Sequence, residues 1–219
     1  MGTLYTALPF DFLRSIAPVA GLVVYPMVIE VHPSVPARSI AELVALAKAN
    51  PGKITMASDG AGTISHVAGE LFKTMAGINM VHVPYRGGAP MVNDLIGGQV
   101  QVALDVVTGS LAHIQSGAAR ALAVTTAARL QAFPDIPTVA ETIPGYEALV
   151  FTGVGAPSGT PEAAIARINA GLADPSIKAR LAELTVTPLA LTPAEFGAYM
   201  AAETEKWAKV IRLAGIKVD

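Results

Sequence analysis

The sequence predicts an α/β protein whose sheets are mainly parallel, and three observations support that fold class. Short apolar segments with strand character alternate with helix-like segments from residue 22 to residue 125. Glycine and proline mark most of the boundaries between them. Hydrophobic residues make up 52% of the 219 residues and charged residues only 15%, which excludes a disordered chain and allows a sizeable core. We therefore expect one large domain or two small lobes.

The elements up to residue 125 follow from their start and stop signals. Ser39 and Glu42 form a capping-box pattern, and the helix that they begin ends at Pro51-Gly52. Ala89-Pro90 begins a short helix that Gly97-Gly98 ends. The expected strands are 22–31, 54–57, 80–83, 100–107 and 119–125, and the expected helices are 39–50, 65–75, 89–96 and 109–116.

The sequence changes character after Thr126. A proline-rich segment, 133–137, leads to an expected strand at 148–155. Asp174-Pro175 and the capping box that begins at Thr192 each predict the start of a helix. The expected helices are 161–172, 174–184 and 193–214. This part of the chain therefore predicts a second, more helical lobe.

Composition narrows the possible partners and cofactors. The net charge of −2 and the pI near 6.1 give no electrostatic basis for binding nucleic acid or an anionic membrane. The absence of cysteine excludes disulfides, thiolate metal sites and cysteine nucleophiles. The longest uncharged run lies between Arg14 and Glu30, contains two prolines, and is shorter than the roughly 18–20 residues that a membrane span needs. The start of the chain also lacks a signal-peptide pattern. We expect no direct membrane insertion.

The most informative segment is the glycine-rich turn at 58–63, between a short strand and a helix. Backbone N–H groups at a helix N-terminus form a site for a carboxylate or phosphate. Glycine lets a ligand approach the backbone, and serine or threonine adds a hydroxyl donor. The candidate ligand-binding residues here are Ser58, Gly60, Ala61, Gly62 and Thr63. Many such turns hold no ligand, and in that case Ser58 and Thr63 are ordinary turn and cap residues.

Three further side chains are candidates for ligand contact. His66 either faces the ligand or stabilises the loop. Arg86 either pairs with a carboxylate or lies in solvent. Asp105 stands in an otherwise apolar strand, where a carboxylate needs partners. It accepts hydrogen bonds either from a ligand amine or hydroxyl or from neighbouring backbone N–H groups.

We find no catalytic residues, and we expect neither a metal nor a cofactor. Ser65 and His66 are adjacent on a helix and therefore point about 100° apart, so they cannot act as nucleophile and base. The sequence has no Gly-x-Ser-x-Gly motif. The four histidines lack the spacing of metal ligands, and the glycine turn lacks the features of a Walker loop or a dinucleotide fingerprint.

A series of motifs along almost the whole chain resembles one family. The motifs are Pro33-Ser34, Pro51-Gly52-Lys53, Ser58-x-Gly60-x-Gly62-Thr63-x-x-His66, Gly69-Glu70-Leu71-Phe72, Val83-Pro84-Tyr85-Arg86-Gly87, residues 94–100, 120–125, 134–141 and 144–147, and Ala156-Pro157-x-Gly159-Thr160-Pro161. In this order and spacing they resemble the substrate-binding proteins of the tripartite tricarboxylate transporters, the Bug family.

The resemblance implies a periplasmic-binding-protein-like fold, with two lobes joined by crossing strands that close over a small mono- or dicarboxylate. It implies a periplasmic location and membrane transporter subunits as partners. In the family, the loop matching 58–63 holds a ligand carboxylate, and the aspartate matching Asp105 lies near the same cleft. We expect a ligand-loop lobe at 29–122 and the remainder of the other lobe at 1–28 and 123–219.

The chain also departs from the family pattern. Family members begin with an export signal, a strand and a Pro/Gly-rich loop, whereas this chain begins where they are well into the first lobe, so we expect that lobe to be incomplete. Asp59 replaces an uncharged residue, and Phe151 lies where tryptophan is frequent. The alternative function is therefore a ligand-free interaction protein, or the partner of a sensor, that retains the fold.

Overall fold

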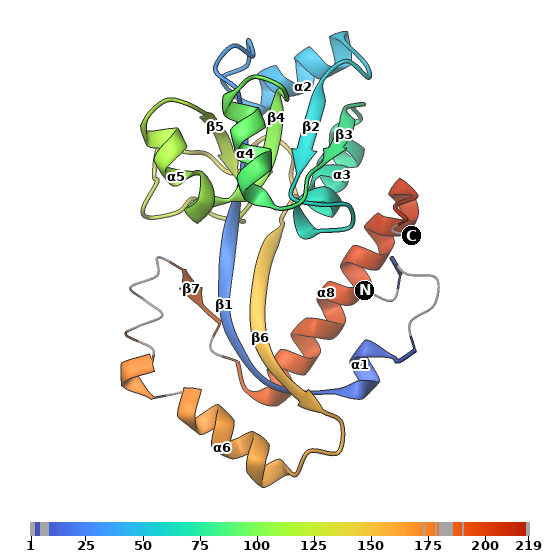
Figure 1. Cartoon of the computed structure of the whole chain (residues 1–219), viewed down its shortest axis with the longest axis vertical. Coiled ribbons are helices and arrows are strands. Elements are labelled where there is room, and N and C mark those ends of the chain that lie inside the picture. Colours follow the sequence, from blue (N-terminus) through green and yellow to red (C-terminus); the bar gives the residue numbers. More distant parts are fainter. Residues whose placement is uncertain are drawn as a thin grey trace. The chain divides into compact units, whose positions relative to one another are not determined.

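The computed structural model describes residues 3–4, 9–172, 174–177, 179, 186–189 and 191–217 (Figure 1). The chain divides into two compact units, Pro26–Val150 and Met1–Tyr25 with Phe151–Asp219. Two long strands, β1 (Ile16–Val31) and β6 (Leu149–Pro157), contain the two points at which the chain passes from one unit to the other.

The sheet of the unit Pro26–Val150 has the strand order β3-β2-β4-β1-β5. The other strands of this path are β2 (Thr55–Ser58), β3 (Val81–Pro84), β4 (Val102–Val106) and β5 (Arg120–Val124). β2 pairs in parallel with β3 and β4, whereas β1 pairs antiparallel with both β4 and β5. Four strands therefore run in one direction, as the sequence predicts. β1 is the exception, because it brings the chain in from the other unit and does not follow a crossover helix.

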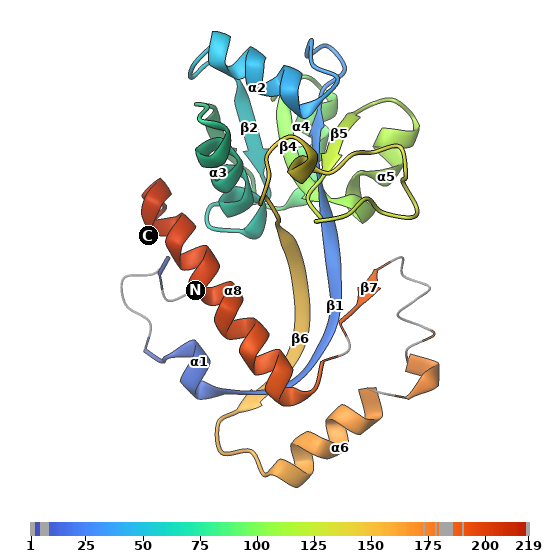
Figure 2. The same ribbon diagram turned by 180° about the vertical axis from the view of Figure 1, so that it is seen from behind.

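Helices cover both faces of this sheet. Figures 1 and 2 place α4 (Gly88–Ile96) and α5 (Val107–Gln115) over one face, and α2 (Ile40–Ala49) and α3 (Ile64–Ala76) over the other. Strands covered on both faces are apolar along their length rather than alternating. The buried residues Val102, Ala103 and Leu104 of β4 follow that rule.

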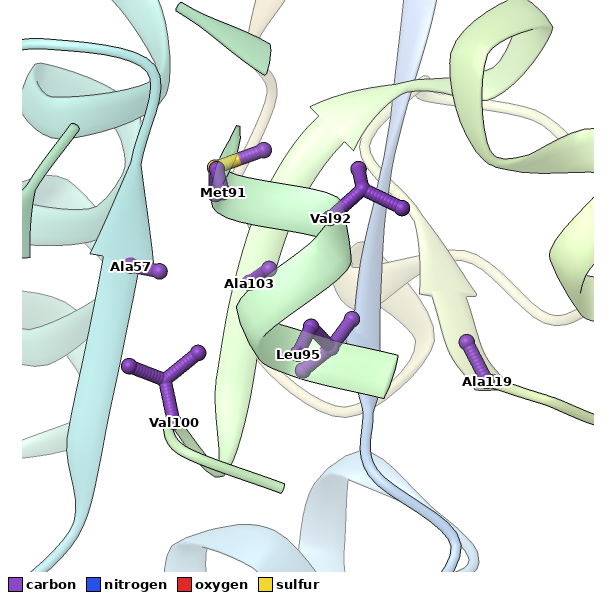
Figure 3. Packing of buried hydrophobic residues seen from close by; sticks show 7 residues of the cluster. All are labelled: Ala57, Met91, Val92, Leu95, Val100, Ala103 and Ala119. Carbon is purple, nitrogen blue, oxygen red and sulfur yellow. The ribbon is translucent and has the colours of Figure 1, made fainter. Parts of the chain in front are cut away.

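The core beneath α4 explains how this helix is held against the face of the sheet. Met91, Val92 and Leu95 lie on one face of α4 and are buried (Figure 3). They form one cluster with Ala57 of β2 and Ala103 of β4, whose small side chains let the helix approach the sheet closely.

Most helix ends lie where the sequence places them. Ser39 accepts a hydrogen bond from the Glu42 N–H at 3.2 Å, although the Glu42 carboxylate caps the Arg38 N–H instead of completing a capping box. Thr192 does form a complete capping box, at the start of α8 (Pro193–Ala214). Gly77 ends α3 in the left-handed conformation.

The compact units divide the chain at different places from the expected lobes 29–122 and 1–28 with 123–219. Residues 123–150 group with the first unit, because the chain returns to the same sheet after β5. The buried Thr125 hydroxyl donates to the Ala148 carbonyl at 2.6 Å, and the Thr125 N–H donates to the Met27 carbonyl at 2.9 Å. The 3-10 helix η1 (Val139–Glu141) lies within this returning segment.

The other unit contains α1 (Phe12–Ser15), α6 (Glu162–Leu172), β7 (Thr187–Pro188) and α8. β7 pairs antiparallel with β1 at Val23 and Val24. Most of the helix expected at 174–184 lies outside the described residues. In the part of the chain that the structure describes, no helix is both long enough and apolar enough to cross a membrane.

Candidate functional site

The candidate site lies at the carboxyl edge of the parallel strands. β2 ends at Ser58, β3 at Pro84 and β4 at Val106, and because these strands are parallel their ends share one edge of the sheet. Helices α3, α4 and α5 all begin there. Ligands of α/β sheets bind at this edge, where the loops and the helix N-termini meet.

The first two loops are bonded to each other. The Tyr85 N–H donates to the Ser58 carbonyl and the Gly87 N–H to the Asp59 carbonyl, each at 2.9 Å. Residues 58–63 and 84–87 therefore form one surface instead of two independent loops.

The turn at 58–63 is a tight turn that leads directly into α3. Gly62 has a φ of 76°, a backbone conformation that residues other than glycine rarely adopt. The Thr63 hydroxyl donates to the Gly60 carbonyl at 2.7 Å and closes the turn. The Val67 N–H is the first to bond within the α3 ladder, to the Thr63 carbonyl. The N–H groups of Ile64, Ser65 and His66 precede it and are left outside the ladder.

The two hydroxyls predicted as ligand donors are engaged within the loop itself. Ser58 is completely buried, and its hydroxyl lies 3.0 Å from the Gly60 carbonyl and 2.6 Å from His82 Nε2. A serine that donates to Gly60 has used its proton, so His82 Nε2 then donates to the serine. Ser58 and Thr63 therefore shape the loop. The N–H groups of Gly60 and Gly62 also bond within it, to Ser58 Oγ and His66 Nδ1, so within the described residues the N–H groups without a partner are those of Ala61 and of the start of α3.

His66 stabilises the 58–63 loop through a hydrogen bond and a stacked ring. Its Nδ1 accepts from the Gly62 N–H at 3.0 Å, and its ring stacks on His82 with 3.6 Å between the ring centroids. Burial lowers the pKa of His66. Burial and the neighbouring His66 lower the pKa of His82 to about 4. Both rings are consequently neutral at neutral pH, which the Gly62 hydrogen bond requires because a protonated Nδ1 cannot accept it.

His66 also lies close to an ion pair on its own helix, α3. His66 Nε2 lies 3.9 Å from the Glu70 carboxylate, which in turn lies 2.6 Å from Lys73 Nζ. His82 is not among the site residues that the sequence predicts. Its only signal in the sequence is its place in β3, the neighbour of the strand that ends at Ser58.

Asp59 folds back onto the first turn of α3. Its carboxylate accepts a hydrogen bond from the Ser65 hydroxyl, and its N–H donates to Ser65 Oγ at 3.1 Å. The loop therefore carries one fixed carboxylate beside the N–H groups that a ligand would use. Arg86 is exposed, and within the described part of the chain it forms no hydrogen bond or ion pair.

Asp105 belongs to a carboxyl pair that the sequence does not indicate. The Ser110 hydroxyl lies 2.7 Å from Glu30 Oε1 and 3.2 Å from Asp105 Oδ2, and the Val106 N–H donates to Asp105 Oδ1 at 2.8 Å. Burial raises the pKa of Glu30 to about 7 and also raises the pKa of Asp105. One oxygen of Asp105 thus accepts from a neighbouring backbone N–H and the other lies beside Ser110, and both alternatives for Asp105 stay open. Among the described residues, no three His, Asp or Glu side chains are placed to hold a metal ion.

Comparisons with known proteins agree with this architecture. The sequence profile of the family described as "Tripartite tricarboxylate transporter family receptor" matches residues 2–216. The solved structure of Rpa4515 from R. palustris with adipate is similar, with a TM-score of 0.87 and 34% identity over 98% of this chain and 74% of its own. The periplasmic binding protein BugD has a TM-score of 0.84 and 33% identity over 99% of this chain and 75% of its own.

A curated relative is the UPF0065 protein in the tcbD-tcbE intergenic region of Pseudomonas sp. strain P51. It is 36% identical over 213 residues, which are 94% of this chain and 63% of the relative, so this chain spans less than two thirds of that protein's length. The family profile nevertheless covers nearly every residue, from Gly2 to Ile216. The chain belongs to the receptor family of the tripartite tricarboxylate transporters.

Proposed function

We propose that this chain is a periplasmic solute receptor that binds a small mono- or dicarboxylate and presents it to the membrane subunits of a tripartite tricarboxylate transporter. One observation carries the proposal: the 58–63 turn leaves N–H groups free at the N-terminus of a thirteen-residue helix, on a chain of this receptor family. The adipate in the related Rpa4515 structure is a ligand of the proposed class. Catalysis has no part in this role.

In this proposal the ligand carboxylate lies over the turn at 60–62 and accepts from the Ala61 N–H and from the N–H groups at the start of α3, because the Gly60 and Gly62 N–H groups already donate to Ser58 and His66. Ser58 and Thr63 hold the turn closed through the Gly60 carbonyl. A rigid loop with N–H groups already oriented binds an anion without first paying an ordering cost.

The remaining candidates act around this anion site. His66 fixes the Gly62 N–H by accepting its hydrogen bond, so it positions the loop. Arg86 is an unpaired cation within the described residues, on the loop that is bonded to Ser58 and Asp59, and it supplies positive charge for an anionic ligand. Asp105 accepts from a donor group elsewhere on the ligand.

A thermal-shift screen against C2–C8 mono- and dicarboxylates, amino acids and phosphate tests the proposal. A ligand at about 100 times its Kd adds about 2.7 kcal/mol to the free energy of unfolding, which raises Tm by about 5–10 °C for a chain of this size. We expect one group of carboxylates to produce such a shift and phosphate to produce none.

The matched variants are Gly62→Ala and Gly117→Ala. Both glycines have a φ of 76°, so alanine pays the same backbone cost at either position. Gly62→Ala should abolish the ligand shift, because the turn must change conformation, whereas Gly117→Ala at the end of α5 should retain it. If no carboxylate raises Tm, the receptor proposal is wrong and the ligand-free interaction protein becomes the better hypothesis.

A further inference from the structure

A cavity of about 370 Å³ lies between α4 and α5, beside the candidate anion loop. Gly88, Val92, Asn93, Asp105, Gly109 and His113 contribute to its wall. Gly88 follows directly after Gly87, whose N–H is bonded to the Asp59 carbonyl. The cavity therefore adjoins the surface formed by the two bonded loops.

The carboxylate of Asp105 is accessible from this cavity because the residues facing it are glycines. A Cβ atom built at Gly109 would lie 2.8 Å from Asp105 Oδ2, and one built at Gly88 would lie 3.7 Å from Oδ1. Neither glycine has a positive φ, so backbone conformation does not require glycine at either position. What the two glycines provide is open space in front of the carboxylate.

The hydrogen bonds indicate which of the two neighbouring carboxyls carries the charge. Glu30 is completely buried, and its Oε2 has no hydrogen-bond partner in the described part of the chain. A charged carboxylate in that position would lack the donors that it needs, whereas a neutral acid tolerates one unpaired oxygen. Asp105 instead receives the Val106 N–H at 2.8 Å and faces the cavity.

If Glu30 carries a proton, the hydrogen bonds that link Glu30, Ser110 and Asp105 all run in one direction. Glu30 then donates to Ser110 Oγ at 2.7 Å, and Ser110 donates its own proton to Asp105 Oδ2 at 3.2 Å. The neutral Glu30 thus keeps Ser110 oriented toward an ionised Asp105. Glu30 is a positioning residue, since it acts on the cavity only through Ser110.

We infer that this cavity is the subsite for a hydrogen-bond-donating substituent of the ligand, an ammonium or hydroxyl group, so that the receptor selects amino- or hydroxycarboxylates over plain carboxylates. The inference rests on the proposed function and names its ligand class. No lysine or arginine lines the cavity, and the one basic side chain in its wall, His113, already interacts with Asp105. A second ligand carboxylate there would therefore be repelled by Asp105 and would compete with it for a single imidazole. An ammonium or hydroxyl would instead donate to Asp105. Within the described residues the side chains of Asn93 and His113 also have no hydrogen-bond partner and face the same space.

Isothermal titration calorimetry on the full chain with matched ligands tests the inference. The series are succinate, malate and aspartate; glutarate, 2-hydroxyglutarate and glutamate; and adipate with 2-aminoadipate. Within the series of the right length, we expect the substituted ligand to bind about 10–100-fold more tightly. Hydrogen bonds to a charged group are worth about 1.5–3 kcal/mol, which corresponds to that range.

Two variants examine the subsite by different means. Asp105→Asn removes the charge with little change in volume, and it should reduce the preference at least about tenfold. Gly109→Ala introduces a Cβ against Asp105 Oδ2 and should weaken only the substituted ligands. Asp135→Asn is the control, since Asp135 is exposed, lies outside the cavity and loses the same charge.

The outcomes separate this inference from the proposed function. Equal affinity for plain and substituted ligands of one length, or a preference that survives both Asp105→Asn and Gly109→Ala, overturns the subsite and leaves the carboxylate receptor standing. A complete absence of carboxylate binding overturns both. If Asp105→Asn fails to fold, Gly109→Ala decides the question alone, because alanine fits the backbone of α5 at that position.

Discussion

Glu30→Gln should change how the stability of the protein depends on pH. Glu30 is buried between β4 and β5, with one carboxyl oxygen unpartnered in the described residues. Burial raises its pKa from 4.5 to about 7. The folded state therefore favours the neutral acid, and the unfolded state releases the proton at lower pH.

The sign and size of the effect follow from these two pKa values. Below a pH of about 4.5 both states hold the proton, and the contribution of Glu30 to stability is fully present. Between about 4.5 and 7 only the folded state holds it, so the free energy of unfolding falls by about 1.4 kcal/mol per pH unit. The total loss is about 3 kcal/mol and is complete above pH 7. Glutamine cannot ionise, and its amide can still donate to Ser110, so the variant should escape this loss.

Urea unfolding of wild type and Glu30→Gln from pH 4.5 to 8, followed by circular dichroism, measures the difference. Trp207 is the only tryptophan and belongs to the other unit, so its fluorescence would not report on this sheet. We expect the variant to gain about 3 kcal/mol over wild type between the two ends of the pH range, or about 6–12 °C in Tm. Glu147→Gln is the control, because Glu147 has no hydrogen-bond partner in the described part of the chain. Parallel pH profiles for wild type and Glu30→Gln would refute the reasoning, since the remaining titrating groups are common to both proteins.

Two further predictions concern the histidine pair and the other unit. The pKa of His82 is lowered to about 4, so the free energy of unfolding decreases as the pH falls from about 6.5 toward 4. His82→Gln should reduce that decrease by about 1–2 kcal/mol, a figure discounted because the ring is half-exposed. Urea unfolding of both proteins at pH 7 and 4.5 measures the difference. An unchanged acid loss in the variant would contradict the assignment. Gly153→Ala should cost about 1–3 kcal/mol in Trp207 fluorescence melts, because its Cβ would lie 2.1 Å from a ring atom of Phe196 and 2.7 Å from a backbone oxygen. Gly171→Ala, in open space on α6, is the control and should not destabilise.

Local patterns in the sequence were sufficient to locate most of the helices and strands, but not their full arrangement. Apolar runs bounded by glycine and proline located β2 and β4 within about two residues, and cap residues located α2 and α8. The direction of β1 was not predictable in the same way, because an antiparallel strand and a parallel strand buried on both faces have similar apolar sequences. The boundary near residue 150 depends on the hydrogen bonds of Thr125 to Met27 and Ala148, which join residues far apart in the sequence.

The candidate site was only partly predictable for the same physical reason. The 58–63 turn is a local feature, and its glycines and hydroxyls are recognisable from their spacing. The partners that determine what its side chains do come from other elements: His82 on β3 for Ser58, and Glu30 on β1 with Ser110 on α5 for Asp105. In the sequence, Glu30 is a single charged residue in an apolar strand, and nothing near it indicates its partners. Only the register Glu30↔Ala103 places it on the same face of the sheet as Asp105, two residues further along β4.

The arrangement of charges around the loop has a consequence for the ligand as a whole. Asp59 is fixed beside the N-terminus of α3, and its proximity contributes to raising the pKa of Asp105. A ligand carboxylate on the 58–63 backbone therefore adds a third negative charge to this edge of the sheet. The free N–H groups and Arg86 can balance one carboxylate, but an ammonium or hydroxyl group on the same ligand would also relieve Asp105. Mutual repulsion among the carboxylates thus acts against a plain dicarboxylate, and salt should strengthen the binding of such a ligand more than that of an aminocarboxylate, because screening weakens repulsion between exposed charges.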